Sequence, residues 1–178
     1  MSISKIKRYV TGHNKDGKAI VTYDDYAPNA VPLSGWPGAG VTEVWVTGEM
    51  PVNNMGESDQ SLRPLQHDPV RNGTIFRVVE IPPESKSAID TEATFAQLGS
   101  GNKPRDEDKA KHPTMHKTNS VDYLVVISGE MWMIMEEGEA LLKAGDCIVQ
   151  RGTNHAWKNT SDKPCLLAAV LVDAHPAP

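Results

Sequence analysis

Short apolar runs alternate with turn-forming residues along this chain, a pattern typical of many strands joined by tight turns. In the N-terminal half the pattern predicts strands at Tyr9–Thr11, at Ala19–Tyr23, from Val41 and from Gly73. A loop rich in proline and glycine separates the second of these strands from the third. Residues 53–72 are polar and show no periodicity, so we predict no strand or helix there.

The pattern becomes denser after Val121, where five apolar runs are separated by turns. The runs are VDYLVVISGE, MWMIMEEGE, ALLKAGDCIVQRG, HAWKN and LLAAVLVDA. Short strands at regular spacing with glycine-containing turns are typical of an antiparallel sandwich or barrel. We therefore expect an all-β fold.

One stretch, Ser87–Leu98, leans toward a helix, because Ile89 and Ala93 belong to a set of residues at roughly helical spacing. Residues 100–111 follow it as a charged segment that contains proline. Two interpretations of this segment stay open, a solvated linker and a mobile flap beside a pocket. The second is open because the segment leads directly into the histidine-bearing residues considered below.

Composition and charge narrow the choice of partners. The chain has 178 residues, which is enough for one domain with its own core. It carries 18 Lys and Arg residues against 23 Asp and Glu residues, for a net charge of −5. A mildly acidic surface repels phosphate backbones and anionic lipids, so we expect neither nucleic acid nor a membrane as partner.

The two cysteines, Cys147 and Cys165, are too few for a disulfide framework or a cysteine-rich zinc site. Both lie in apolar runs, so we expect them to be reduced, buried packing residues in a reducing compartment. The first ten residues include basic side chains but no apolar signal segment, and no stretch approaches the length of a membrane span. These features predict a soluble, cytoplasmic protein.

Three side chains able to bind a metal ion lie on the C-terminal strand series: His116, Asp122 and His155. Strand alternation places Asp122 on the same face as Leu124 and Val126. An aspartate on the apolar inner face of a strand is costly unless something compensates its charge. A metal ion, an Arg or Lys partner, or exposure at the mouth of a barrel would each do so, and the residues alone leave the three open.

The stretch 112–174 resembles the conserved barrel of the cupin superfamily. The first cupin motif is Gly-x5-His-x-His-x(3 or 4)-Glu-x6-Gly. His116, Asp122 and Gly129 match it at the family's spacing. Thr118 stands where the family has its second histidine, and Asp122 replaces the glutamate. The upstream glycine of the motif is absent.

The second cupin motif is Gly-x5-Pro-x-Gly-x2-His-x3-Asn. Its latter half is intact here as Gly152, His155 and Asn159. Gln150 replaces the proline, and the first gap, which starts at Gly145, is one residue shorter than in the family. Two motifs in this order and at this spacing carry the resemblance.

The resemblance implies a cupin-type double-stranded β-helix, a jelly-roll barrel with extra N-terminal strands. We expect a single cupin domain over residues 1–178, divided into N-terminal strands and loops (1–83), an insert or flap (84–111) and the barrel with its motifs (112–174). Cupins commonly pair through N-terminal strands, so the resemblance also implies a homodimer to which the strands before residue 50 contribute.

In cupins the motif histidines and the glutamate bind a divalent metal ion inside the barrel. Carried over by position, His116, Asp122 and His155 remain as ligands, whereas Thr118 is a poor one. Two imidazoles and one carboxylate are typical of non-haem iron(II) sites, and the same set also suits zinc, manganese or nickel. The competing interpretation is a degenerate cupin that has lost the metal, in which the two histidines serve a substrate or the structure.

Since cupin substrates sit inside the barrel, four side chains are tentative pocket residues: Thr118, Met131, Met133 and Trp157. For the methionines and the tryptophan, simple core packing is the alternative. His112 is a candidate for catalysis, as a spare ligand or a proton shuttle, against the simpler interpretation of an exposed loop histidine. The remaining histidines are assigned no role: His13, His67 and His175.

Together these features predict a metal-dependent cupin enzyme acting on a small, hydrophobic or aromatic organic acid or ketone. The metal would act as a Lewis acid in a non-redox lyase or isomerase reaction, by decarboxylation, dehydration or isomerisation. One alternative is an iron(II) dioxygenase with the same three ligands. The other is a cupin that binds a small molecule without catalysis, as the missing histidine suggests.

Overall fold

The computed structural model describes residues 3–56, 58–84, 89–101 and 104–177. Within these ranges the chain forms eleven strands and two short helices, and the predicted all-β fold is confirmed. The elements are β1 (Lys7–His13), β2 (Ala19–Tyr26), β3 (Asn29–Pro32), β4 (Gly40–Thr47), β5 (Thr74–Ile81), α1 (Thr91–Gln97), α2 (Asp106–Lys109), β6 (Ser120–Ser128), β7 (Glu130–Met135), β8 (Glu139–Lys143), β9 (Cys147–Arg151), β10 (His155–Lys158) and β11 (Cys165–Asp173).

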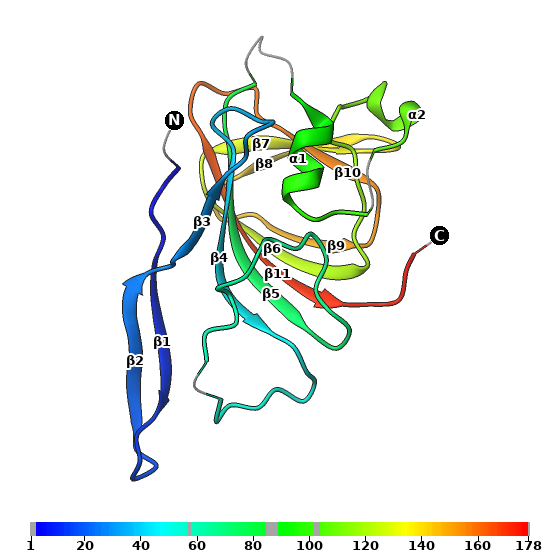
Figure 1. Ribbon diagram of the computed structural model, residues 1–178. Helices are drawn as coiled ribbons and strands as arrows, with labels where there is room; N and C mark the ends of the chain where they lie inside the picture. The colour runs from blue at the N-terminus through cyan, green and yellow to red at the C-terminus, as the bar shows by residue number, and fades with distance from the viewer. Residues whose placement is uncertain (1–2, 57, 85–88, 102–103, 178) are drawn as a thin grey trace.

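The strands form three antiparallel sheets (Figure 1). The largest has the strand order β3-β4-β5-β11-β6-β9, and a three-stranded sheet has the order β10-β7-β8. One hydrophobic cluster contains residues of both sheets, Ile75 and Leu167 from the larger one and Met131 from the smaller one. The two sheets therefore pack against each other around a common core, and strands from both halves of the chain build it.

Alternation along the strands decides which side chains face this core. In β6, Asp122, Leu124 and Val126 share one face, as the sequence pattern predicts, and this face is buried whereas Tyr123 and Val125 are exposed. In β6 the interior of the barrel is thus lined by every second residue. Asp122 is among these interior side chains.

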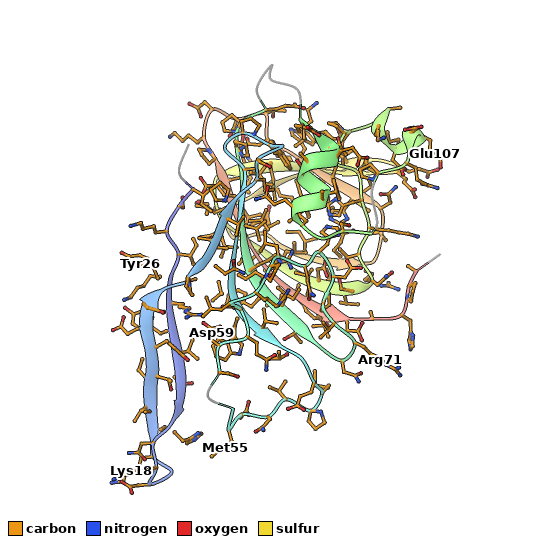
Figure 2. The ribbon with its side chains drawn as sticks, viewed as in Figure 1. Lys18, Tyr26, Met55, Asp59, Arg71 and Glu107 are labelled. Carbon is orange, nitrogen blue, oxygen red and sulfur yellow. The ribbon has the colours of Figure 1, made fainter. Side chains whose placement is uncertain are left out.

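The hairpin β1-β2 forms a two-stranded sheet of its own and projects from the body of the molecule, with Lys18 at its far tip (Figure 2). Arg8 ties it to the barrel, since its guanidinium bonds Asp25 of the hairpin at 2.8 Å and the backbone oxygen of Val44 in β4 at 3.1 Å. The same guanidinium lies 2.7 Å from Asp59, which belongs to the long loop between β4 and β5. Arg8 thereby joins three separate segments.

The stretch Ser87–Leu98, predicted to be a helix or turn, contains the shorter helix α1, whose first turn is capped by Asp90, which accepts the N–H of Ala93. Ser87 itself lies outside the described residues, as do residues 102–103 of the segment that follows. Residues 106–109 of the charged segment form the short helix α2, in which Asp108 is buried.

One cysteine departs from expectation. Cys165 is buried, as predicted, but Cys147 is exposed. The prediction for Cys147 was wrong because the residue takes an outward position at the start of β9, the last strand of the larger sheet. The prediction assumed that the whole apolar run is buried, but alternate residues of β9 are exposed.

Candidate functional site

Three imidazole rings form a continuous cluster, although only two of them belong to the cupin-like motifs. The ring centroids of His67 and His116 are 4.8 Å apart, and those of His116 and His155 are 4.4 Å apart. Aromatic side chains close the two ends. Phe95 of α1 lies 5.7 Å from His67 and 5.6 Å from His116, and Trp157 lies 5.0 Å from His155.

The backbone fixes the pairing of the two motif histidines. His116 and His155 form an isolated β-bridge in which each donates its backbone N–H to the other's backbone oxygen at 2.9 Å. His155 opens β10, and His116 lies before the start of β6. The bridge therefore brings the first and second motifs together at one point of the barrel.

Hydrogen bonds from Nδ1 to backbone oxygens orient both rings. The Nδ1 atom of His116 lies 2.7 Å from the backbone oxygen of Thr114, and that of His155 lies 2.9 Å from the backbone oxygen of Thr153. A carbonyl oxygen only accepts, so Nδ1 carries the proton in each ring and Nε2 presents a lone pair. Neither Nε2 atom is hydrogen-bonded to any residue in the described ranges.

Burial keeps these rings neutral. It is the main cause that lowers the pKa of His67, His116 and His155, and for His155 the pKa falls to about 3. At neutral pH each ring is thus an uncharged imidazole. Such a ring can accept a hydrogen bond or a proton at its free nitrogen, or donate the lone pair to a metal ion.

His67, which the sequence analysis left without a role, reaches the cluster from the loop between β4 and β5. Its side chain is buried, and its Nδ1 atom lies 3.0 Å from the hydroxyl of Ser100 and 3.6 Å from the carboxylate of Asp68. The segment 53–72 shows no periodicity and no motif spacing to mark this histidine. Only the three-dimensional structure shows that the loop covers the site.

Hydrogen bonds stabilise the buried carboxylate of Asp122. Its carboxylate accepts the hydroxyl of Ser120 at 2.5 Å and that of Thr118 at 3.4 Å. Burial nevertheless raises its pKa to about 6, against the opposing effects of these hydroxyls and of the positive charge of Arg77. Of the three forms of compensation considered above, exposure is excluded because Asp122 is 5% exposed. Thr118 is a buried donor to the carboxylate.

The side chains of His116, Asp122 and His155 differ in how well they fit a metal ion. His116 and His155 suit one chemically, because both are neutral and offer Nε2. The carboxylate of Asp122 is engaged by two hydroxyls, and over the ranges that the structure describes no group of three or more His, Cys, Asp and Glu side chains is arranged to hold an ion. The ligand set His116, Asp122 and His155 stays a prediction.

Comparison with known proteins shows to which family the chain belongs. The cupin domain family matches residues 105–172, which contain both motifs. The oryzines biosynthesis cluster protein J of Aspergillus oryzae is 30% identical over 97% of this chain and 85% of its own length. The chain belongs to the cupin superfamily.

Other similar proteins include the cupin-domain-containing oxidoreductase virC of Hypocrea virens, 27% identical over 95% of this cupin and 76% of that protein. Among solved structures, the putative ethanolamine utilization protein Q of Salmonella typhimurium is 11% identical, with a TM-score of 0.46 over 97% of this chain and 99% of that one. No helix in the described part of the cupin is long and apolar enough to cross a bilayer.

His112 lies near the cluster but is oriented differently. Its Nδ1 atom accepts the backbone N–H of Thr114 at 3.2 Å, so its proton is on Nε2, which lies 3.7 Å from the carboxylate of Glu84. The interpretation as an exposed loop histidine is wrong, since the residue is buried. A catalytic role for it stays a prediction.

The cupin has an open cleft of about 790 Å³ that borders the half-buried His116. Charged side chains line it, among them Arg105, Asp108 and Lys117. Of the tentative pocket residues, Met133 lines a second groove, beside β9, whereas Met131 and Trp157 are part of the hydrophobic core. The cleft gives solvent a route to His116.

Proposed function

We propose that this cupin is a metal-dependent enzyme that transforms a small organic molecule at the cluster of His67, His116 and His155. The observation that carries the proposal is the pair of neutral imidazoles whose Nε2 atoms have no hydrogen-bond partner among the described residues, inside the barrel and next to an open cleft. Relatives named as oxidoreductases and as proteins of biosynthesis clusters support an enzymatic role in small-molecule metabolism.

His116 and His155 would hold the ion through Nε2, and a third donor would have to join them by side-chain rotation, either Asp122 or His67. When bound, a divalent ion would polarise a carbonyl or carboxylate oxygen of the substrate. Side chains of the cupin itself would act next to the bound ion. Phe95 and Trp157 pack against the rings and shield these sides of them from water, which strengthens electrostatic interactions there, and a free Nε2 would accept a proton.

For the reaction we propose a non-redox lyase or isomerase type, acting on a hydrophobic or aromatic acid or ketone. A second candidate is an iron(II) dioxygenase at the same residues, which relatives named as oxidoreductases favour. Oxygen uptake during turnover separates the two. A cupin that only binds its ligand is the third candidate, supported by Thr118 in the place of the motif histidine.

Metal analysis tests the proposal. After expression in metal-supplemented medium, we expect the purified protein to hold near-stoichiometric divalent metal by inductively coupled plasma mass spectrometry. His155→Ala removes one of the two oriented donors, so its metal content should fall at least about tenfold. His13→Ala, an exposed change in the hairpin, is the matched control and should keep the metal. Absence of metal from the wild type would leave only the binding role.

We also propose that two copies associate through the outer face of the larger sheet. A row of cross-strand neighbours there is apolar, running from Phe76 through Val170 and Tyr123 to Val149. Tyr123 and Val149 are 56% and 58% exposed, and Val125 beside them is 43% exposed. Contiguous apolar surface on the outside of a sheet marks an interaction site.

A second copy is the partner that fits, because each copy also carries an apolar hairpin. The hairpin β1-β2 exposes Tyr9, Val21 and Tyr26, and a two-stranded sheet is only marginally stable by itself. The same two surfaces on both copies allow a closed, two-fold pairing. This gives the implied homodimer a physical basis.

Val125→Lys tests the association. The side chain points away from the core, so the variant should fold, while a charge in the centre of the apolar face should prevent pairing. Light scattering coupled to size exclusion should give twice the 19.4 kDa chain mass for the wild type and the single-chain mass for the variant. Val70→Lys, at an exposed loop residue, should remain dimeric. A monomeric wild type would reject the proposal.

A further inference from the structure

Arg77 is a charged side chain in the interior of the barrel that the proposed function does not use. It lies on β5 between interior positions, opposite Glu43 of β4 and Ala169 of β11, and only 4% of its surface is exposed. A buried guanidinium has to find partners for its N–H groups or leave them without hydrogen bonds. The hydrogen bonds of Arg77 therefore show which of its N–H groups still lack an acceptor.

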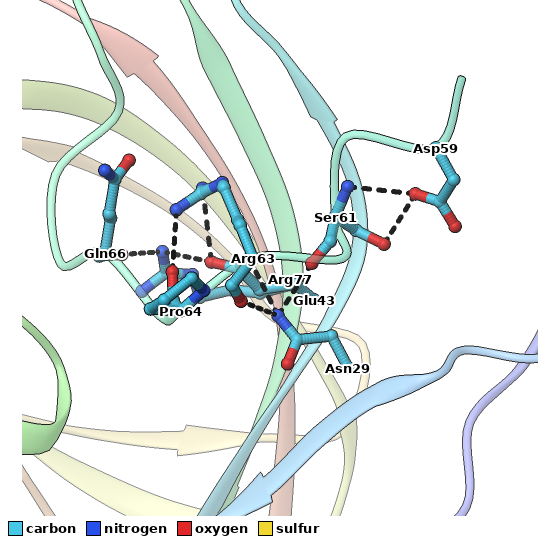
Figure 3. A network of polar contacts seen from close by, with 8 residues as sticks. All are labelled: Asn29, Glu43, Asp59, Ser61, Arg63, Pro64, Gln66 and Arg77. Carbon is cyan, nitrogen blue, oxygen red and sulfur yellow. Dashed lines mark hydrogen bonds and ion pairs between the residues drawn. The ribbon is translucent and has the colours of Figure 1, made fainter. Parts of the chain in front are cut away.

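The donors of Arg77 are only partly satisfied (Figure 3). Nη2 donates to the backbone oxygen of Gln66 at 2.6 Å and lies 3.3 Å from the Oε1 atom of Glu43. Nε is fully buried and has no hydrogen-bond partner among the residues that the structure describes. Asp122 forms no ion pair with Arg77 within the described ranges, and its carboxylate is already held by Ser120 and Thr118.

The unused donor belongs to the same interior as the histidine cluster. Gln66, whose carbonyl Arg77 holds, directly precedes His67 in the chain. The positive charge of Arg77 also contributes to the lowered pKa of His67 and of His116, so the guanidinium is close enough to both rings to act on them electrostatically. A ligand at the rings is within the electrostatic reach of Arg77.

We propose that Arg77 binds the carboxylate of an organic acid through its free Nε–H, with the body of the acid against the histidine cluster. A carboxylate is the partner that a guanidinium fits best, in geometry and in charge. The inference rests on the proposed function and deepens it, because it selects acids over ketones as the substrate class. It also accounts for a buried donor that no side chain of the barrel satisfies.

Binding of benzoate and of its uncharged analogue benzamide to the 178-residue chain tests this, by titration calorimetry after treatment with a chelator. Chelation ensures that no metal ion provides the carboxylate site. We expect the wild type to bind benzoate at least about tenfold more tightly than benzamide. Arg77→Lys keeps the charge beside Glu43 but lacks Nε, and should lose this preference while remaining folded.

Arg63→Lys is the matched control, since Arg63 also faces Glu43, at 3.5 Å, and should keep the preference for benzoate. Equal binding of the two probes by the wild type, binding of neither, or an unchanged preference in Arg77→Lys would each overturn the inference. Metal content measured on the same samples separates the two proposals. Metal without a preference for the acid rejects the role of Arg77 alone, and a preference for the acid without metal rejects metal dependence alone.

Discussion

Replacing Glu43 by alanine is expected to lower the free energy of unfolding by about 3–5 kcal/mol, because it removes one partner of a buried ion pair. Glu43 has no exposed surface, and its Oε1 atom lies 3.3 Å from Arg77 and 3.5 Å from Arg63. Without this carboxylate the guanidinium of Arg77 would stay buried and uncompensated. Urea denaturation at neutral pH measures the loss as a shift in midpoint at unchanged slope.

Two further variants make this result specific. Glu43→Met combined with Arg77→Met removes both charges and should cost less than the sum of the two single changes, since apolar side chains of similar size can replace a buried pair. Glu139→Ala, at an exposed position of β8, should stay within about 0.5 kcal/mol of the wild type. A loss below about 1 kcal/mol for Glu43→Ala would mean that water reaches Arg77.

The strands were predictable because their signal is local. Alternation placed Asp122, Leu124 and Val126 on one face of their strand, and in the structure all three are buried. The short strand β3 was missed, since Asn29–Pro32 lies in a segment whose prolines and glycines predict a loop. It pairs with β4 at the edge of the sheet, where a strand needs only one neighbour.

The site was predictable only in part, because half of it comes from residues that are distant in sequence. The motif spacing singled out His116 and His155, and the structure brings them together at one β-bridge. His67, Phe95 and Arg77 carry no such spacing, and their roles follow from how the loop after β4, the helix α1 and the strand β5 pack on the barrel. Sequence patterns indicate the strand or helix on which a residue lies, but they do not indicate which residues from distant parts of the chain it contacts.

Gly129→Ala should destabilise the protein by about 3 kcal/mol. This motif glycine joins β6 to β7 with φ at +78°, a conformation that costs a residue with a Cβ atom about 1–2 kcal/mol. A Cβ atom there would also lie 2.7 Å from the backbone oxygen of Pro164 and 2.9 Å from the Cα atom of Cys165. Those atoms are backbone at the start of β11 and cannot rotate away, so the crowding adds about 1–3 kcal/mol.

Gly138→Ala separates the two causes. Gly138 joins β7 to β8 with φ at +81°, but a Cβ atom there would meet nothing within 4 Å. Its replacement should therefore cost only the conformational part, about 1–2 kcal/mol. Thermal or urea unfolding of both variants gives the comparison, and equal losses would mean that the turn conformation alone requires glycine at position 129. A larger loss for Gly129→Ala would show that the motif glycine is required by its contact with β11, a strand that lies far beyond the motif in sequence.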